Sequence, residues 1–187
     1  MIIGLSGKIG SGKSTIAEIF KQNGFYLDSF ANSVKDVSNC IFGFDRNRLE
    51  GITKEDREWR EMPDERYSFL LGKKFSPRDS LILIGTIFGR NQIHPDVWVE
   101  TVFNRYSLSG NKDLLITDVR FPNEYNSVKK RGGILIRIER ENTYKIEHES
   151  ETSLDTYTFD YVIENNGTLE ELIEKVNNIL SNLQGKK

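Results

Sequence analysis

A glycine-rich stretch near the start of the chain contains the residues best suited to chemistry. It reads Gly7-Lys8-Ile9-Gly10-Ser11-Gly12-Lys13-Ser14, which fits the nucleoside-triphosphate P-loop pattern of glycine, four arbitrary residues, then Gly-Lys-Ser. Its glycines let backbone N–H groups approach a polyphosphate without a Cβ in the way. The lysine would place a cation against the β- and γ-phosphates, and the serine hydroxyl would bind Mg2+. The stretch therefore predicts a site for ATP and Mg2+.

The segments on either side of this stretch are those that a P-loop requires. Residues 1–6 form a short apolar run with β-branched members, and apolar residues recur at helical spacing from Ile16 to Phe20. An ordinary tight turn is the alternative, but it does not require a preceding strand and a following helix. The predicted nucleotide contacts are Gly7, Lys8, Gly10, Ser11, Gly12, Lys13, Ser14 and Thr15.

Composition narrows the class of protein. The 187 residues suit one domain, and 26 Lys plus Arg against 28 Asp plus Glu leave no basic excess for holding nucleic acid. Cys40 is the single cysteine, so no internal disulfide can form and packing is its expected role. The first strand leaves no room for a signal peptide, and no apolar run approaches the roughly 20 residues of a membrane helix. We therefore expect a cytoplasmic protein with no membrane or nucleic-acid partner.

Four further apolar runs predict strands, and helical patterns separate them. The runs are 25–30, 114–118, 134–138 and 159–163, and a last helix starts after Thr168, which with Glu171 suggests a capping box. Strands that alternate with helices predict an α/β fold of three layers, with a five-stranded parallel sheet covered by helices on both faces. We expect residues 1–187 to form a single P-loop domain.

The middle of the chain is less regular. Residues 43–75 carry charges of both signs, which suits a solvated, partly helical insertion or, alternatively, a mobile arm that closes over a second substrate. Two helix starts follow, at Ser76-Pro77 and at Pro95-Asp96. A GTPase switch is not expected, because Asn111-Lys112-Asp113 lacks the spacer of the guanine-binding motif. A nucleic-acid motor would be longer and more basic.

Several short motifs follow the P-loop in a fixed order. They include Ser76-Pro77-Arg78, Ile84-Gly85-Thr86 with Arg90, Asp96-Val97-Trp98-Val99 and Thr117-Asp118-Val119-Arg120-Phe121-Pro122-Asn123-Glu124. In this order the chain resembles the deoxynucleoside monophosphate kinases of bacteriophages, in the P-loop nucleoside monophosphate kinase group. The resemblance implies phosphoryl transfer from ATP to a deoxynucleoside 5'-monophosphate, with residues 31–106 mainly binding the acceptor and a short lid at 139–157.

Two alternatives to this activity stay open. Residues 148–165 also resemble animal phosphomevalonate kinases, which would make the acceptor another small phosphate compound. A nucleotide-binding regulator with no acceptor is the second alternative. A homodimer through the helices of the middle region is a further open question.

Charged residues outside the P-loop are the candidates for catalysis and acceptor binding. A planar guanidinium can hold phosphate oxygens bidentately, which suggests Arg78, Arg90 and Arg120 for the acceptor, although each also suits a surface ion pair. Asp118 follows a buried strand and would hold Mg2+ together with Ser14, or else cap a turn. No general base is expected, because a phosphate monoester is already anionic near neutral pH.

The resemblance implies roles for seven more residues. Arg137 and Arg140 flank the end of the strand at 134–138 and precede the polar stretch of the lid, from which Arg140 would reach the transferring phosphate. Asn165 and Gly167 lie in the loop that contacts adenine in related kinases. Asn-Gly is also simply a good turn. On the acceptor side the implied residues are Lys35, Thr86 and Trp98. For Lys35 the alternative is a solvated helix side chain, and for Trp98 it is the core.

Overall fold

A computed structural model describes residues 1–110, 113–141 and 152–185, and it divides into two compact units. Unit 1 comprises Met1–Ser29 and Val102–Lys187, and unit 2 comprises Phe30–Thr101. The predicted acceptor region, 31–106, covers nearly the same residues as unit 2. Of the predicted lid, residues 142–151 lie outside the described residues.

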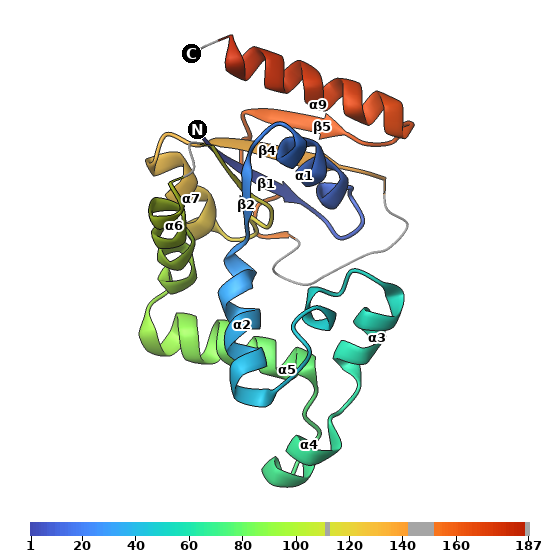
Figure 1. Cartoon of the computed structure of the whole chain (residues 1–187), viewed down its shortest axis with the longest axis vertical. Helices are drawn as coiled ribbons and strands as arrows, with labels where there is room; N and C mark the ends of the chain where they lie inside the picture. The colour runs from blue at the N-terminus through green and yellow to red at the C-terminus, as the bar shows by residue number, and fades with distance from the viewer. Residues whose placement is uncertain (111–112, 142–151, 186–187) are drawn as a thin grey trace. The chain divides into compact units, whose positions relative to one another are not determined.

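Unit 1 contains a parallel sheet of five strands, as the sequence predicts (Figure 1). The strands follow the order β2-β3-β1-β4-β5 across the sheet. They are β1 Ile2–Gly7, β2 Tyr26–Asp28, β3 Leu114–Ile116, β4 Ile134–Glu139 and β5 Tyr161–Glu164. β1 lies between β3 and β4, so the loop that leaves its carboxyl end emerges at the centre of the sheet.

Helices cover both faces of this sheet. Strand side chains alternate between faces, and Ile3 and Leu5 of β1 pack with α1 Lys13–Gln22 and α9 Leu169–Gln184. Gly4 faces the opposite way, where an added Cβ would lie 2.8 Å from Val119 and 3.6 Å from Val128 of α7 Pro122–Lys130. Thr168 caps α9 by accepting a hydrogen bond from the Glu171 backbone N–H at 3.3 Å.

Unit 2 is helical, and aromatic side chains fill much of its interior. It contains α2 Phe30–Phe42, η1 Arg48–Glu50, α3 Lys54–Glu61, α4 Glu65–Leu71, α5 Pro77–Ile82, η2 Leu83–Ile93 and the start of α6 Val97–Ser109. The contacting aromatic residues are Phe42, Phe44, Trp59, Tyr67 and Phe75. The insertion at 43–75 is therefore partly helical, with its aromatic side chains packed together, whereas motion over a substrate stays a prediction.

Most predicted strands differ from the observed ones by one to three residues at their ends, and two elements differ in a way that has a structural reason. The strand expected at 25–30 covers only Tyr26–Asp28, because Phe30 is already the first residue of α2. The Phe30 side chain is 2% exposed, so it is buried as a helix residue and not as a strand residue. The helix that starts at Ser76 has the predicted cap, in which Ser76 and Asp79 bond reciprocally, but it continues from Leu83 as the wider π-helix η2. Gly89 of η2 makes room for the Trp98 ring, since a Cβ there would lie 2.4 Å from it.

Candidate active site

The P-loop connects β1 to α1, and its lysine folds back over it. Lys13, the first residue of α1, donates hydrogen bonds from Nζ to the backbone oxygens of Gly7 and Lys8, the latter at 2.8 Å. The side chain therefore lies along the loop rather than pointing away from it. Ser14 is exposed and Thr15 is half-buried at the positive end of the α1 dipole. The motif thus forms the local structure that binding a polyphosphate requires.

Ser11 is the most buried residue of the loop, at 1% exposed. Its hydroxyl oxygen has no hydrogen-bond partner among the described residues. A buried hydroxyl without a partner costs free energy, and such groups concentrate at functional sites. The predicted nucleotide contacts thus include a side chain whose hydroxyl is unsatisfied within the described part of the chain.

Asn165 supports the P-loop from the loop that follows β5. Its side-chain Nδ2 donates to the Ser11 backbone oxygen at 2.8 Å, and its backbone N–H donates to the Glu139 oxygen at 2.7 Å. Gly12 is required beside it, because its φ is 101° and an added Cβ would lie 2.4 Å from the amide nitrogen. The sequence suggested Asn165 only as a neighbour of adenine, and its support of the P-loop was not predicted.

Replacing Asn165 with aspartate tests this support. Asn165→Asp keeps the shape of the side chain but turns an oxygen toward the Ser11 carbonyl, so we expect KM for ATP to rise about tenfold through loss of one buried hydrogen bond. Asn166→Asp is the matched control, because the Asn166 side chain accepts a hydrogen bond from the Glu141 N–H at 2.9 Å and aspartate can still accept it. Equal KM values in the two variants, measured by initial rates, would contradict the proposed support.

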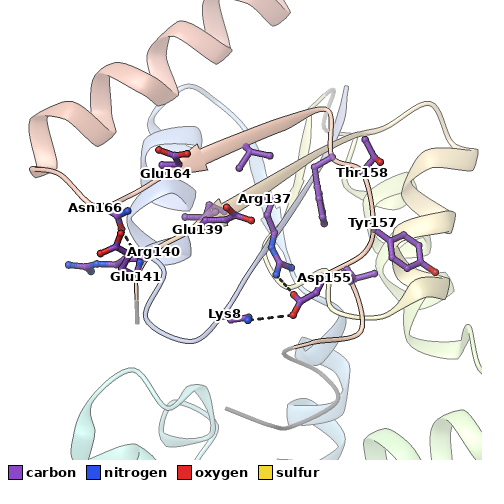
Figure 2. A pocket seen from close by; sticks show the side chains of 14 residues that line it. Lys8, Arg137, Glu139, Arg140, Glu141, Asp155, Tyr157, Thr158, Glu164 and Asn166 are labelled. Carbon is purple, nitrogen blue, oxygen red and sulfur yellow. Dashed lines mark hydrogen bonds and ion pairs between the residues drawn. The ribbon is translucent and has the colours of Figure 1, made fainter. Parts of the chain in front are cut away.

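A second connection reaches the P-loop through Arg137 of β4 (Figure 2). Its guanidinium donates to the Ser6 hydroxyl at 3.1 Å and to the Asp155 carboxylate at 2.5 Å. The same carboxylate lies 3.5 Å from Lys8 of the P-loop. The Arg137 side chain is only 10% exposed, so the structure gives it an anchoring role between β4 and the loop. Whether it also contacts nucleotide stays a prediction.

Lys8, Arg137 and Asp155 line a pocket of about 650 Å³ in unit 1, a size typical of small-molecule sites. Lys8, Arg137 and Arg140 supply its cations, and Asp155 lies beside the first two (Figure 2). Tyr157 and Thr158 also line the pocket. Arg140 is exposed there. Exposure leaves the Arg140 guanidinium able to move, as its predicted role at the transferring phosphate would require.

The predicted strand-end carboxylate lies just past β3. Backbone hydrogen bonds continue the sheet beyond the strand, from the Thr117 N–H to Asp28 of β2 and from the Val119 N–H to Leu5 of β1. Asp118 is held between these two bonds at the carboxyl edge of the sheet, where β1 runs into the P-loop. Ligand sites of open α/β sheets lie at this edge.

Glu124 fixes the backbone that follows Asp118. It is 2% exposed and accepts hydrogen bonds from the backbone N–H groups of Arg120 at 2.8 Å and Phe121 at 3.1 Å. The carboxylate therefore orients the segment that carries Arg120, whose side chain is half-buried. The sequence motif contains Glu124, but only the structure shows what it does.

A second strand-end carboxylate was missed. Asp28 ends β2, its side chain is 2% exposed, and it binds Arg105 through two hydrogen bonds at 2.9 and 2.8 Å. The rule that singled out Asp118, a carboxylate directly after an apolar strand, would also have found Asp28. Its partner is 77 residues away and could not have been identified from sequence.

The predicted acceptor residues other than Arg120 lie in unit 2. Lys35 is 13% exposed and 2.5 Å from Glu50, so it is not the solvated side chain of the alternative interpretation. Trp98 is 6% exposed and donates to the Gly85 oxygen at 2.8 Å, which places it in the core of this unit. Thr86 and Arg90 lie on η2, exposed and half-buried respectively. Contact of any of these with an acceptor stays a prediction.

Mg2+ suits the oxygen atoms at the P-loop and the strand end. Ser14 offers a hydroxyl and Asp118 a carboxylate, both hard oxygen ligands. Among the residues that the structure describes, no group of three or more His, Cys, Asp or Glu could hold a metal alone. Mg2+ in nucleotide sites is bound through one or two protein oxygens and the substrate phosphates, so this sparse set fits it.

The parallel sheet with a P-loop after its central strand defines a P-loop nucleotide-binding protein. A family model for deoxynucleotide monophosphate kinase matches residues 54–176. The chain is 30% identical over 197 residues to a putative deoxynucleotide monophosphate kinase of Acanthamoeba polyphaga mimivirus, with 97% of each chain covered. It belongs to the deoxynucleotide monophosphate kinase family and is a nucleotide kinase.

A further relative agrees with this assignment, and a solved structure agrees with the fold. The chain is 24% identical over 212 residues to the deoxynucleoside-5'-monophosphate kinase of Escherichia phage T5, covering 82% of this chain and 85% of that protein. A dephospho-CoA kinase from Campylobacter jejuni has a similar fold, with a TM-score of 0.52, 17% identity, and 100% and 98% of the two chains covered. Within the described ranges, no helix is long and apolar enough to cross a membrane.

Proposed function

We propose that this kinase transfers the γ-phosphoryl group of ATP to a deoxynucleoside 5'-monophosphate, giving ADP and the deoxynucleoside diphosphate. The observation that carries the proposal is the P-loop lysine at the sheet edge where Asp118 and Arg120 follow β3, in a chain of this family. An acceptor phosphate oxygen forms a bond to the γ-phosphorus, and the bond from that phosphorus to the β,γ-bridging oxygen breaks. ADP leaves with that oxygen.

The residues of the site would have separate roles in this phosphoryl transfer. Lys13 and the P-loop amides neutralise the β- and γ-phosphates, and Ser14 and Asp118 would hold the Mg2+ that screens the same charge. Arg120 orients the acceptor, with its backbone fixed by Glu124. No side chain has to remove a proton, because a phosphate monoester is largely dianionic above its second pKa of about 6.

ADP release is the direct test. ATP and Mg2+ are mixed with each deoxynucleoside monophosphate, its ribose counterpart or phosphomevalonate, and the Lys13→Ala variant serves as the blank. We expect deoxynucleotides to stimulate ADP release above the blank. Stimulation by phosphomevalonate alone would instead assign a different small phosphate acceptor. ATP binding without stimulation by any of these compounds would support a nucleotide-binding regulator.

A further inference from the structure

Two arginines of unit 2 lie against the turn at Gly51, and the charge of a third, Arg78, acts on one of them, Arg60. Arg57 and Arg60 belong to α3, and Arg78 lies in the first turn of α5. Gly51 ends η1 with a φ of 66°, and a Cβ on it would lie 2.4 Å from the Arg60 guanidinium carbon. The absence of a side chain at Gly51 therefore lets a guanidinium lie directly on the backbone of the turn. We call Arg57, Arg60 and Arg78 the arginine cluster.

The charges of this cluster are poorly compensated. Arg57 donates to the backbone oxygens of Gly51 at 3.2 Å and Ile52 at 2.8 Å. Arg60 donates to the Leu49 oxygen at 3.4 Å, the long limit of a hydrogen bond, and its buried Nε has no partner among the described residues. Within that part of the chain, no carboxylate oxygen lies within 4.0 Å of a nitrogen of either side chain.

The nearby carboxylates are occupied or distant. Glu50 is 2.5 Å from Lys35 and also accepts from Arg46, so its charge is already shared by two cations. Glu61 lies 3.8 Å from Arg78, a long contact between side chains that are 63% and 41% exposed, which contributes little. Burial lowers the pKa of Arg60, and the neighbouring charge of Arg78 lowers it further. Arg57 and Arg60 thus lie near like charge with no ion pair among the described residues, and the ion pair of Arg78 with Glu61 is long and exposed.

We propose that the arginine cluster binds the phosphate group of the acceptor monophosphate, an inference that rests on the proposed function. Guanidinium groups bind phosphate oxygens through paired hydrogen bonds, and a phosphate monoester carries close to two negative charges at neutral pH. Such a dianion would supply the buried Arg60 Nε with an acceptor and remove the repulsion between Arg60 and Arg78. Arg57 and Arg60 are thereby added to Arg78 as acceptor-binding residues.

Removing Arg60 should weaken the binding of monophosphates without lowering the stability of the fold. In Arg60→Ala, calorimetric titration of each deoxynucleoside monophosphate should show an affinity lower by about tenfold to a hundredfold, the usual effect of a charged hydrogen bond. The affinity for the matching unphosphorylated deoxynucleosides and KM for ATP should not change. The melting temperature should stay equal or rise, because the variant loses a buried unsatisfied donor and a like-charge contact.

Arg48→Ala is the matched control, because it removes the same charge from the same region. The Arg48 guanidinium lies 4.4 Å from the centre of the Trp59 ring and 3.5 Å from Asp56, so it is already partnered. Equal loss of monophosphate affinity in both variants would mean a general charge effect and would overturn the proposal. If Arg60→Ala failed to fold, Arg60→Lys would replace it, since lysine keeps the charge but loses the paired donors.

The remaining outcomes distinguish this inference from the proposed function. A folded Arg60→Ala protein whose preference for monophosphates over deoxynucleosides equals that of the wild type would overturn the phosphate site, whereas ADP release by the wild type would leave the kinase activity standing. Loss of that preference in the variant, with no ADP release by the wild type, would support the site and refute the activity. A wild type with no preference for monophosphates would overturn the site.

Discussion

Lys13→Ala is expected to lower turnover by about a hundredfold or more while the protein stays folded, because the substitution removes a positive charge from the transferring phosphate. Lys13 is the first residue of α1, and its Nζ donates hydrogen bonds to the backbone oxygens of Gly7 and Lys8 in the P-loop. The helix itself is stabilised by the buried side chains of Ile16, Ala17 and Phe20, which the substitution leaves in place. Steady-state ADP release and thermal unfolding measure the two effects separately.

Lys21→Ala is the control for this variant. Lys21 lies on the same helix, is 62% exposed and is 3.8 Å from Glu18. Its substitution therefore removes a positive charge from the protein surface and not from the P-loop. Its turnover should match that of the wild type. Near-normal turnover in a folded Lys13→Ala protein would contradict the assignment of the P-loop as the phosphoryl-transfer site.

Asp118→Asn is expected to lower turnover by about a hundredfold and to raise the Mg2+ concentration needed for half-maximal rate, because an amide binds a hard cation less strongly than a carboxylate does. The substitution preserves the volume of the side chain. The backbone on either side is fixed by the bonds of Thr117 and Val119 to the neighbouring strands, so the segment should keep its position. The measurement is a Mg2+ titration of ADP release at saturating ATP and acceptor.

Asp36→Asn controls for the loss of a carboxylate in general. Asp36 is 60% exposed on α2 and contacts Arg46 at 2.6 Å, so its variant should show the wild-type Mg2+ dependence. If Asp118→Asn were folded and also showed the wild-type Mg2+ dependence, Asp118 would be a structural cap, the alternative that its position in the sequence leaves open.

Much of the fold could be predicted because its signals are local. An apolar run, a glycine loop and a helical pattern are each contiguous in the chain, so residues 1–20 already define the strand, the P-loop and α1. The same reasoning found all of the strands and the cap at Ser76. It missed η2, because a π-helix and an α-helix place apolar residues at similar spacings. The wider turn accompanies a tertiary contact, the packing of Trp98 on Gly89, which local spacing does not show.

The connections that hold the site together could not be predicted, because each joins residues far apart in the chain. Asn165 reaches Ser11 across 154 residues, and Arg137 reaches Ser6 across 131, contacts that exist only because β4 lies beside β1 and β5 beside β4. Arg60 is a further example, because the packing around Gly51 leaves its buried Nε without a hydrogen-bond partner among the described residues.

The sequence by itself determined the P-loop, the order of strands and helices, and the strand-end Asp118, because each is encoded by neighbouring residues. Only the tertiary structure decided which side chains hold the P-loop in place, that Trp98 and Lys35 are enclosed in unit 2, and that Arg57 and Arg60 have no ion pair among the described residues. Burial and charge compensation depend on which segments pack together, and that information is distributed over the whole chain.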